Sequence, residues 1–257
     1  MYNGSKTAVG PGVNGCPETS GGCDEYTPGY YPSGITVKNA TAIFREGIYW
    51  VVGGMSLQAN GNVRPSTAPA TNPSDQIGGT MFYFSGTGTI SVAANSGNKP
   101  PAVAFNTTSG SGVFAFGAKC TAGSSIPSNL PATFTGSVLL APCTGTYGDP
   151  ASGQRGILFF QDRSASGVSA EFHGGGQALL AGAMYFHHCN STENSLPCGS
   201  PPTYYNDTLV MEGTPGAGTY VLGNITVDNI QLTGTSDIYM DLNPSATYAI
   251  LKASLLR

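Results

Sequence analysis

The sequence predicts an all-β fold, a right-handed parallel β-helix (a solenoid) with protruding loops, and three observations support this prediction. A glycine leads into a short run of strand-forming residues five times along the chain, usually with an aromatic residue two or three places on. Most of these runs are followed by a short β-type pair and a polar, glycine-bearing turn. No segment carries an apolar stripe with the period of a helix. A repeated unit that is too small to bury its own apolar face is expected to stack on its neighbours.

The repeated motifs recur at irregular intervals. The glycine-led segments are 47–52, 79–84, 156–161, 182–187 and 218–223, and the second motif begins at Ser56, Ile90 and Ile230. A β-sandwich, the alternative all-β architecture, predicts fairly even strands and no repeated motif. Recurrence with insertions of variable length therefore favours the β-helix.

In chain order, the prediction begins with a disulfide-stapled N-terminal cap or lead-in at residues 1–34, which are rich in turn-forming residues. Residues 35–257 form a single β-helix domain, with strands expected at 35–37, 41–44, 48–52, 81–84 and 89–92. Prolines at 65–75 indicate a protruding loop, because proline cannot donate to a strand ladder. An irregular insertion is expected at about 98–150, with strand-like pieces at 102–105, 113–116 and 138–140. The regular pattern returns from 153 and ends in an apolar strand at 248–256.

Composition limits the kinds of partner. Charged residues make up 9% of the chain, and 40% of it is hydrophobic, which argues against disorder. A net charge of −4, with ten Lys and Arg scattered singly, gives no electrostatic footprint for nucleic acid or an anionic membrane. No apolar run approaches the roughly 18 to 20 residues that span a bilayer. The polar, glycine-rich first 15 residues are unlike a signal peptide. We therefore expect a mature or excised fragment with an added start Met.

The six cysteines indicate an oxidising compartment. They form three pairs that are local in sequence: Cys16 with Cys23, Cys120 with Cys143, and Cys189 with Cys198. Each pair would close a short loop, as disulfides do in small secreted segments. Zinc is the alternative, on the cluster His187-His188-Cys189 with Cys198. No Cys-x-x-Cys spacing supports zinc, and adjacent histidines on a strand point to opposite faces. We favour disulfides.

Four segments carry a resemblance to a known family. They read Gly-Ile-Tyr-Trp-Val-Val-Gly-Gly-Met-Ser-Leu at 47–57, Gly-Ile-Leu-Phe-Phe-Gln-Asp-Arg at 156–163, Leu-Ala-Gly-Ala-Met-Tyr-Phe at 180–186 and Ile-Gln-Leu-Thr-Gly-Thr-Ser-Asp-Ile at 230–238. In this order they resemble the glycine-rich C-terminal β-helix region of tight-adherence (Flp-type, TadE/TadG-like) pilus-assembly proteins. Gln161-Asp162-Arg163 is the most specific element. His187-His188-Cys189 departs from the family, which usually has Pro-Asn there. The resemblance implies an envelope or surface protein without a known catalytic site, and supplies no substrate.

Candidate binding residues lie at one strand exit and on loops. Asp162 and Arg163 follow an apolar strand, where a carboxylate and a guanidinium can bind a sugar or a carboxylate, or instead close a structural corner. Among the tyrosines, Tyr26, Tyr30, Tyr31, Tyr204 and Tyr205 are expected on loops, available to a glycan or a protein partner. Most other aromatic residues lie within the repeated strands, where an internal stack is expected.

Catalytic and metal sites are harder to assemble from this sequence. His173, His187 and His188 would gather with Glu171 only if the segments 168–175 and 182–189 stack on each other, and His188 must face opposite His187. Acids that are spaced for glycan cleavage are few: Asp237 with Asp241, and Asp162 with Glu171. We therefore expect no catalytic residue, no metal and no cofactor.

The expected function is a non-catalytic, cell-surface or secreted structural or adhesive protein. Its expected roles are pilus-related or envelope assembly and surface attachment, at the exterior of a bacterial envelope. Possible partners are a surface glycan, an envelope or pilus protein, or a second copy of the chain. The alternative is a carbohydrate-active enzyme, a polysaccharide lyase or glycoside hydrolase, on the same scaffold.

Overall fold

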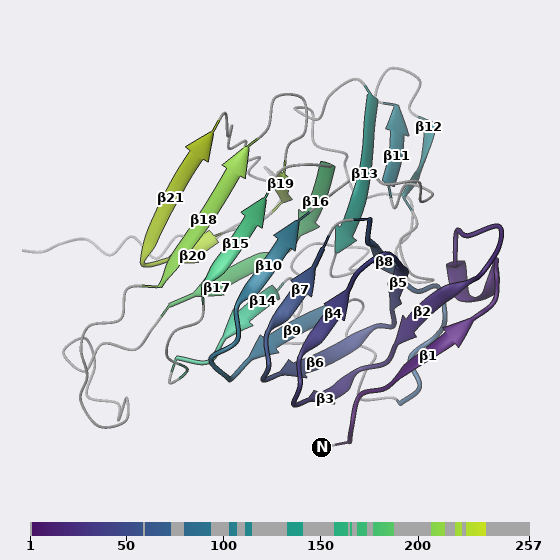
Figure 1. The fold of residues 1–257 in the computed structure, drawn as a ribbon, viewed down its shortest axis with the longest axis horizontal. Helices are drawn as coiled ribbons and strands as arrows, with labels where there is room; N and C mark the ends of the chain where they lie inside the picture. The colour runs from purple at the N-terminus through teal and green to yellow at the C-terminus, as the bar shows by residue number, and fades with distance from the viewer. Residues whose placement is uncertain are drawn as a thin grey trace, which may run out of the picture.

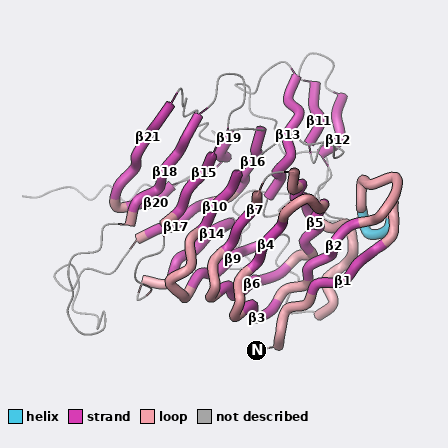
Figure 2. The backbone as a smooth tube through the Cα atoms, viewed as in Figure 1, coloured by secondary structure: helices cyan, strands magenta, loops and turns pink. Residues whose placement is uncertain are grey.

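The structure is a computed structural model that describes residues 2–58, 60–72, 80–93, 103–106, 111–114, 133–140, 157–163, 165, 169–173, 177–187, 207–213, 219–222 and 225–234. These residues are nearly all in β-strands or the turns that join them, with one short 3-10 turn, η1 (Val13–Gly15) (Figure 2). Within these ranges no helix is long and apolar enough to cross a membrane.

The strands fall into three sheets, which we call A, B and C. Sheet A contains six strands: β3 (Gly29–Tyr31), β6 (Gly47–Val51), β9 (Thr80–Phe84), β14 (Ile157–Gln161), β17 (Ala183–Phe186) and β20 (Ile225–Val227). Sheet C contains six: β4 (Ile35–Val37), β7 (Met55–Leu57), β10 (Ile90–Ala93), β15 (Ala170–His173), β18 (Thr208–Gly213) and β21 (Asn229–Gly234). Sheet B contains nine: β1 (Lys6–Val9), β2 (Cys23–Tyr26), β5 (Thr41–Phe44), β8 (Asn62–Pro65), β11 (Val103–Asn106), β12 (Ser111–Phe114), β13 (Thr133–Leu140), β16 (Gln177–Ala181) and β19 (Thr219–Leu222).

The chain visits the three sheets in a fixed order, B then A then C, and repeats this order from β2 to β21 with one interruption. We call each set of three successive strands a rung. Every strand from β2 onward pairs in parallel with the equivalent strand of the next rung, except in the hairpin of β11 and β12. Successive rungs lie along the long axis, so the colour in Figure 1 runs from purple at one end to yellow at the other.

Alternation along each strand builds the core. In sheet C, one inward column runs through Val37, Leu57, Val92, Phe172 and Met211, all buried. Outward neighbours on the same strands are polar, such as Thr36, Ser56 and Ser91. Because successive side chains on a strand point to opposite faces, this period-2 pattern buries like residues on like.

Aromatic side chains dominate the inner face of sheet A. Tyr49, Phe82 and Phe159 are fully buried and aligned across three rungs. The ring centroids of Tyr49 and Phe82 lie 5.0 Å apart, and those of Phe82 and Phe159 lie 5.7 Å apart. Each such pair stabilises the fold by about 1 kcal/mol beyond its buried area.

Glycine is required at the turn that leads from sheet A to sheet C. Gly54 has φ +85°, and a Cβ there would lie 2.5 Å from the carbonyl oxygen of Thr89 in the next rung. The backbones approach closely because Met55 N donates a hydrogen bond to that same carbonyl oxygen, at 3.0 Å. Only a residue without a side chain fits both the conformation and the space.

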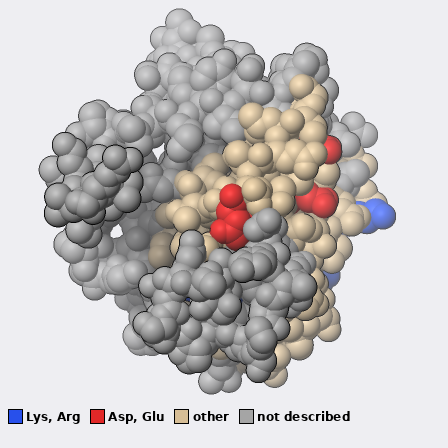
Figure 3. All heavy atoms as spheres, turned by 90° about the vertical axis from the view of Figure 1, so that its left-hand side faces the viewer, with Lys and Arg blue, Asp and Glu red and all other residues tan. Residues whose placement is uncertain are grey.

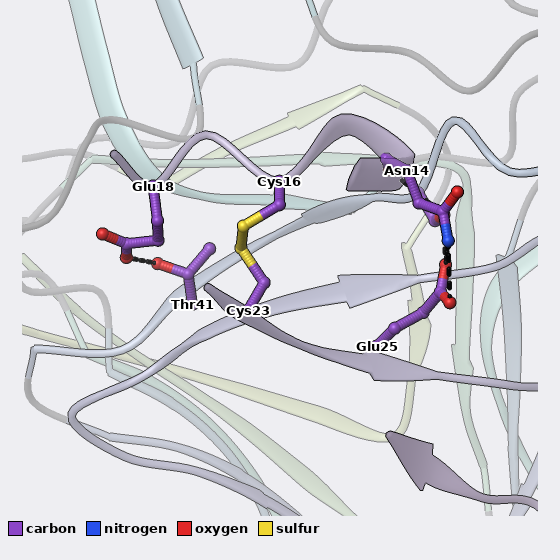
Figure 4. Close-up of a disulfide and its surroundings, with 7 residues drawn as sticks. Asn14, Cys16, Glu18, Cys23, Glu25 and Thr41 are labelled. Carbon is purple, nitrogen blue, oxygen red and sulfur yellow. Dashed lines mark hydrogen bonds between the residues drawn. A yellow bond between two sulfur atoms is a disulfide. The ribbon is translucent and has the colours of Figure 1, made fainter. Parts of the chain in front are cut away.

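The N-terminal end of the stack is covered by the chain itself. β1 runs antiparallel to β2 at the edge of sheet B, and Asn3 makes an isolated bridge to Tyr30 at the edge of sheet A. The Cys16–Cys23 disulfide then fixes the intervening loop over the outer face of sheet B, where both cysteines pack against buried Ile43 (Figure 4).

Glu25 anchors this covering loop beside the disulfide. Its carboxylate is buried and accepts hydrogen bonds from Asn14 Nδ2 at 3.0 Å, from Ser66 Oγ at 2.8 Å and from the Arg45 guanidinium at 2.8 Å. On the other side of the disulfide the Thr41 hydroxyl donates to Glu18 (Figure 4). Burial alone would raise the pKa of Glu25, but the hydrogen bonds from Arg45, Ser66 and Asn14 outweigh it and hold the pKa below its ordinary value.

The opposite end of the stack is open in the part of the chain that the structure describes. Ile230 and Leu232 on β21 continue the two inward columns of sheet C, yet they are 48% and 50% exposed. On β20, Ile225 and Val227 are half-buried and pack against the core from the same end. The two ends of the molecule therefore differ in kind.

The expected order of motifs is largely confirmed, with one correction. The first four glycine-led segments form β6, β9, β14 and β17 of sheet A, but the fifth forms β19 of sheet B. The second motif forms strands of sheet C each time: β7, β10 and β21. Within the expected insertion at 98–150, β11 and β12 pair antiparallel with each other, and β11 pairs antiparallel with β13.

The expected cysteine pairing is confirmed for Cys16 and Cys23. The other two expected pairs, Cys120 with Cys143 and Cys189 with Cys198, lie outside the described residues.

Candidate functional site

The outer face of sheet A carries a column of aromatic side chains, which we call the aromatic strip. Its members occupy equivalent positions on five consecutive rungs: Tyr30, Trp50, Tyr83, Phe160 and Tyr185. All are half-buried, because each lies one residue along the strand from an inward-facing position. A sixth rung continues the column with Thr226.

The rings of the aromatic strip contact one another along the stack. Phe160 lies parallel to Tyr83 and to Tyr185, with an interplanar angle of 9° in both pairs and centroids 5.9 and 4.9 Å apart. The Phe160 ring is therefore stacked between two parallel neighbours, with the closer contact to Tyr185. The Trp50 indole is turned by 72° from the Tyr83 ring, so it does not continue this parallel stack.

A second column lies beside the strip, formed by the residues that directly follow the strands of sheet A. We call it the polar column: Ser85, Asp162, His187 and Asp228. The strip and the column are linked from rung to rung, because Trp50 Nε1 donates a hydrogen bond to Ser85 Oγ of the next rung. The Tyr185 and His187 rings also meet edge to face, with centroids 5.8 Å apart.

Tyr83 and Asp162 form the strongest link between the two columns. The Tyr83 hydroxyl donates a hydrogen bond to Asp162 Oδ2 at 2.5 Å. Burial, together with the bonded and negatively charged Asp162, raises the pKa of Tyr83 to about 12. The phenol is therefore a hydrogen-bond donor throughout the physiological range and not a base.

A network of buried polar groups lies behind the polar column. Gln161 and Asp207 are buried, and Gln161 Nε2 donates to Asp207 Oδ2 at 2.6 Å. Asp228 joins them to the surface: its Oδ2 accepts from the Asp207 backbone N–H at 3.3 Å, and its Oδ1 lies 2.5 Å from His187 Nδ1. The arrangement holds Asp228 and His187 in fixed positions at the corner between sheets A and C.

A separate ionisable cluster lies on the outer face of sheet C. His173 Nδ1 lies 2.6 Å from Glu212 Oε2 on the next rung, and His173 Nε2 lies 3.3 Å from Glu171 Oε2 on its own strand. Burial alone would lower the pKa of His173, but the two carboxylates outweigh it and raise the pKa. Because the carboxylates bond to opposite ring nitrogens, the three side chains do not converge on one point. Among the described residues, no group of three or more His, Cys, Asp or Glu side chains could hold a metal ion.

The structure places some of the predicted site residues on the outer face of sheet A and others in the core. Asp162 lies in the polar column and Tyr30 lies in the aromatic strip. Tyr26 and Tyr31 are not on loops as expected: they are buried in β2 and β3, where Tyr26 Oη donates to the Thr36 carbonyl and Tyr31 Oη donates to the Thr27 carbonyl.

Arg163 follows Asp162 in the turn, and its Nε is buried without a hydrogen-bond partner. Tyr204 and Tyr205 lie outside the described ranges, and so do His188, Asp237 and Asp241.

The condition under which the histidines would gather is not met. His173 is on β15 of sheet C, whereas His187 follows β17 of sheet A, and these two strands pair with different neighbours. The segments 168–175 and 182–189 therefore do not stack on each other. Glu171 and His173 do share a strand face, as their spacing predicts.

Sequence reasoning missed the aromatic strip, although its signal is present. Each of the first four glycine-led segments contains an inward residue followed directly by an aromatic residue: Trp50, Tyr83, Phe160 or Tyr185. The aromatic residue follows the glycine by three residues at Trp50 and Tyr185 and by four at Tyr83 and Phe160. The difference arises because Gly47 pairs with Thr80 and not with Gly79, and because the register of β14 with β17 shifts between Ile157 and Phe159. Alignment on the glycine therefore hides an outward column that alignment on the strand register reveals.

The geometry favours broad contact over chemistry at one point. The strip and the polar column extend along the stack, and their acidic groups are engaged with neighbouring side chains. Asp162 and Asp228 are two rungs apart, roughly 9.5 Å at a strand spacing of about 4.8 Å. Comparison of the chain with models of protein families, with curated proteins and with solved structures found no match.

Proposed function

We propose that this chain is a non-catalytic structural or adhesive protein of the cell exterior that makes contact through the outer face of sheet A. We also propose that its three sheets form a right-handed parallel β-helix. The fixed order of sheets B, A and C over successive rungs supports the β-helix. The hand is the one that parallel crossover connections adopt in nearly all proteins.

The aromatic strip carries the proposal. A row of five half-buried aromatic side chains, aligned over five rungs, is an extended apolar surface of the kind that marks interaction sites. Aromatic side chains supply much contact area at low cost in conformational entropy, which suits adhesion.

The cell exterior is supported by the Cys16–Cys23 disulfide, because such bonds persist in oxidising compartments. A role in pilus-related or envelope assembly comes from the resemblance to tight-adherence proteins. Two of the segments that carry it, at 47–57 and 156–163, contribute Trp50, Phe160 and Asp162 to the strip and the polar column.

The first experiment measures retention of the purified protein on three surfaces: a polysaccharide-coated one, a protein-coated one and an uncoated apolar one. Trp50→Ser with Tyr185→Ser removes two of the five rings of the strip and should reduce retention about ten-fold, or about 1.4 kcal/mol. Val210→Ser is the matched control, since Val210 is a half-buried residue on the outer face of sheet C. Equal retention of the double variant and the control would remove the strip from the function.

A second candidate function, glycan cleavage, has one specific observation in its favour. Asp162 and Asp228 lie in one column, and their estimated separation of roughly 9.5 Å is near the upper end of the range for inverting glycosidases. Release of new chain ends from a polysaccharide, abolished by Asp162→Asn and by Asp228→Asn with the fold intact, would establish this reading and reject the non-catalytic one.

A further inference from the structure

We propose that the aromatic strip and the polar column together bind a linear, uncharged polysaccharide chain that lies along the stack of rungs. This inference rests on the proposed function, because it names the ligand of the same surface.

The extent of the site indicates a polymer. Small molecules are usually bound in concave pockets that enclose most of their surface. The strip instead lies on the outer face of a sheet and spans five rungs, which is about 19 Å at a strand spacing of about 4.8 Å. An extended chain can contact all five rungs at once, whereas a single sugar contacts one or two.

The chemistry of the strip suits an amphipathic chain. A ring stacked between parallel neighbours, as Phe160 is, contacts a ligand mainly through its edge, and the edge of an aromatic ring carries the positive part of its quadrupole, which attracts hydroxyl oxygens. Trp50 is turned out of the parallel stack and contributes a differently oriented ring. Pyranose rings offer both hydroxyl oxygens and apolar C–H surfaces to these groups.

The charges beside the strip select against acidic chains. The polar column contains two carboxylates, Asp162 and Asp228, while the strip and the column contain no Lys or Arg. At the end of the stack, the described surface shows acidic side chains near its middle and basic side chains only at its margin (Figure 3). The whole chain carries a net charge of −4, so a polyuronate would be repelled at close and at long range. A neutral chain meets acceptors for its hydroxyl donors without this repulsion.

The test uses three neutral hexasaccharides, of β-1,4-glucose, β-1,4-N-acetylglucosamine and β-1,4-mannose, and one acidic hexasaccharide, of α-1,4-galacturonate. Titration calorimetry on the full chain should show binding of at least one neutral probe, with affinity rising from the disaccharide to the longer oligomers. The galacturonate probe should bind at least about ten-fold more weakly, a difference of about 1.4 kcal/mol. Asp162→Asn with Asp228→Asn should reduce the difference in affinity between the neutral and the galacturonate probes, and so should added salt.

Two controls separate contact from folding. Trp50→Ser should weaken binding of the neutral probe about ten-fold, whereas Val210→Ser on sheet C should leave it unchanged, and the unfolding curve of each variant should show that it is folded at the temperature of the titration. Tyr185→Phe keeps the ring stack and should retain most of the binding.

The outcomes separate this inference from the proposed function. No binding of any neutral probe, or equal binding of galacturonate, overturns the polysaccharide ligand. If strip-dependent retention on the protein-coated surface persists in that case, the adhesive function stands with a protein partner. If no surface retains the protein, both proposals fail.

Discussion

Tyr83 and Asp162 are 79 residues apart in the sequence, and the phenol of one donates a hydrogen bond to the carboxylate of the other at 2.5 Å. They belong to adjacent strands of sheet A, because β14 follows β9 in the stack although residues 85–156 separate the two strands in the chain. The contact therefore tests whether the rung of β8, β9 and β10 is in register with the rung of β13, β14 and β15, across the long insertion.

The Tyr83–Asp162 contact predicts a titration. Asp162→Asn should lower the pKa of Tyr83 from about 12 toward its ordinary value of 10.0, because two of its three causes depend on the carboxylate. Burial, the largest cause, persists in the variant, so the pKa should stay above 10.0. NMR titration of ring-labelled tyrosine, assigned with Tyr83→Phe, measures the change. An unchanged pKa would show that the register differs from the one described.

Gly54 predicts a steric effect with a close control. Gly54→Ala should destabilise the fold in two ways: positive φ costs about 1 kcal/mol, and the Cβ that would lie 2.5 Å from the Thr89 carbonyl oxygen adds about 1 to 3 kcal/mol. Gly21 has φ +77° and open space around its Cβ, so Gly21→Ala should cost only the first part. Denaturant unfolding measures both variants. Equal losses would contradict the close approach of the second and third rungs.

Glu25 predicts acid sensitivity of the N-terminal covering loop. The pKa of Glu25 in the folded protein is below its ordinary value of 4.5. Its contribution to the free energy of unfolding is therefore complete above pH 4.5 and is lost as the pH falls through the lowered pKa. Glu25→Gln should cost about 2 kcal/mol near neutral pH and flatten the acid limb of stability against pH. Hydrogen exchange of Val9 and Cys16 amides, together with unfolding between pH 2 and 7, tests this. Exposed Lys6–Asp24 supplies a control, since Lys6→Gln should have little effect.

His173 predicts the opposite dependence on pH. Its pKa is raised above 6.5 by Glu212 and Glu171, against the lowering effect of burial. Its contribution is therefore complete below 6.5 and is lost as the pH rises through the folded value. His173→Gln should remove this loss of stability at rising pH, which denaturant unfolding between pH 5 and 9 measures. Imidazole NMR shifts of the wild type give the folded pKa directly, and a value at or below 6.5 would contradict the double contact.

The strand content was predictable from the sequence, because glycine-led runs such as 47–52 combine a turn residue with β-formers. The parallel pairing followed from recurrence, but recurrence did not show that the segment at 218–223 belongs to sheet B while the other four glycine-led segments belong to sheet A. Rung length varies with insertions, so the number of residues between motifs does not fix the sheet. Pairing partners such as Leu180 and Val221 are set by the stack as a whole.

The candidate site was less predictable for a different reason. Whether Tyr26, Tyr30 or Tyr31 faces the core depends on strand register, and a shift of one residue reverses every side chain. Tyr30 faces outward, whereas Tyr26 and Tyr31 face inward, although turn-forming residues lie close to all three in the sequence. The corner network of Gln161, Asp207 and Asp228 was beyond reach, because its members come from three separate rungs.

The two ends of the described stack differ in whether they can accept a further parallel strand. β1 runs in reverse against β2, so a further parallel strand of sheet B cannot be added there without displacing it. At the other end Ile230 and Leu232 present, in register, the same kind of residues that every earlier coil presents to its successor. Within the described residues, the carboxyl-terminal end of the stack therefore offers an in-register apolar edge to a further strand, and the amino-terminal end does not.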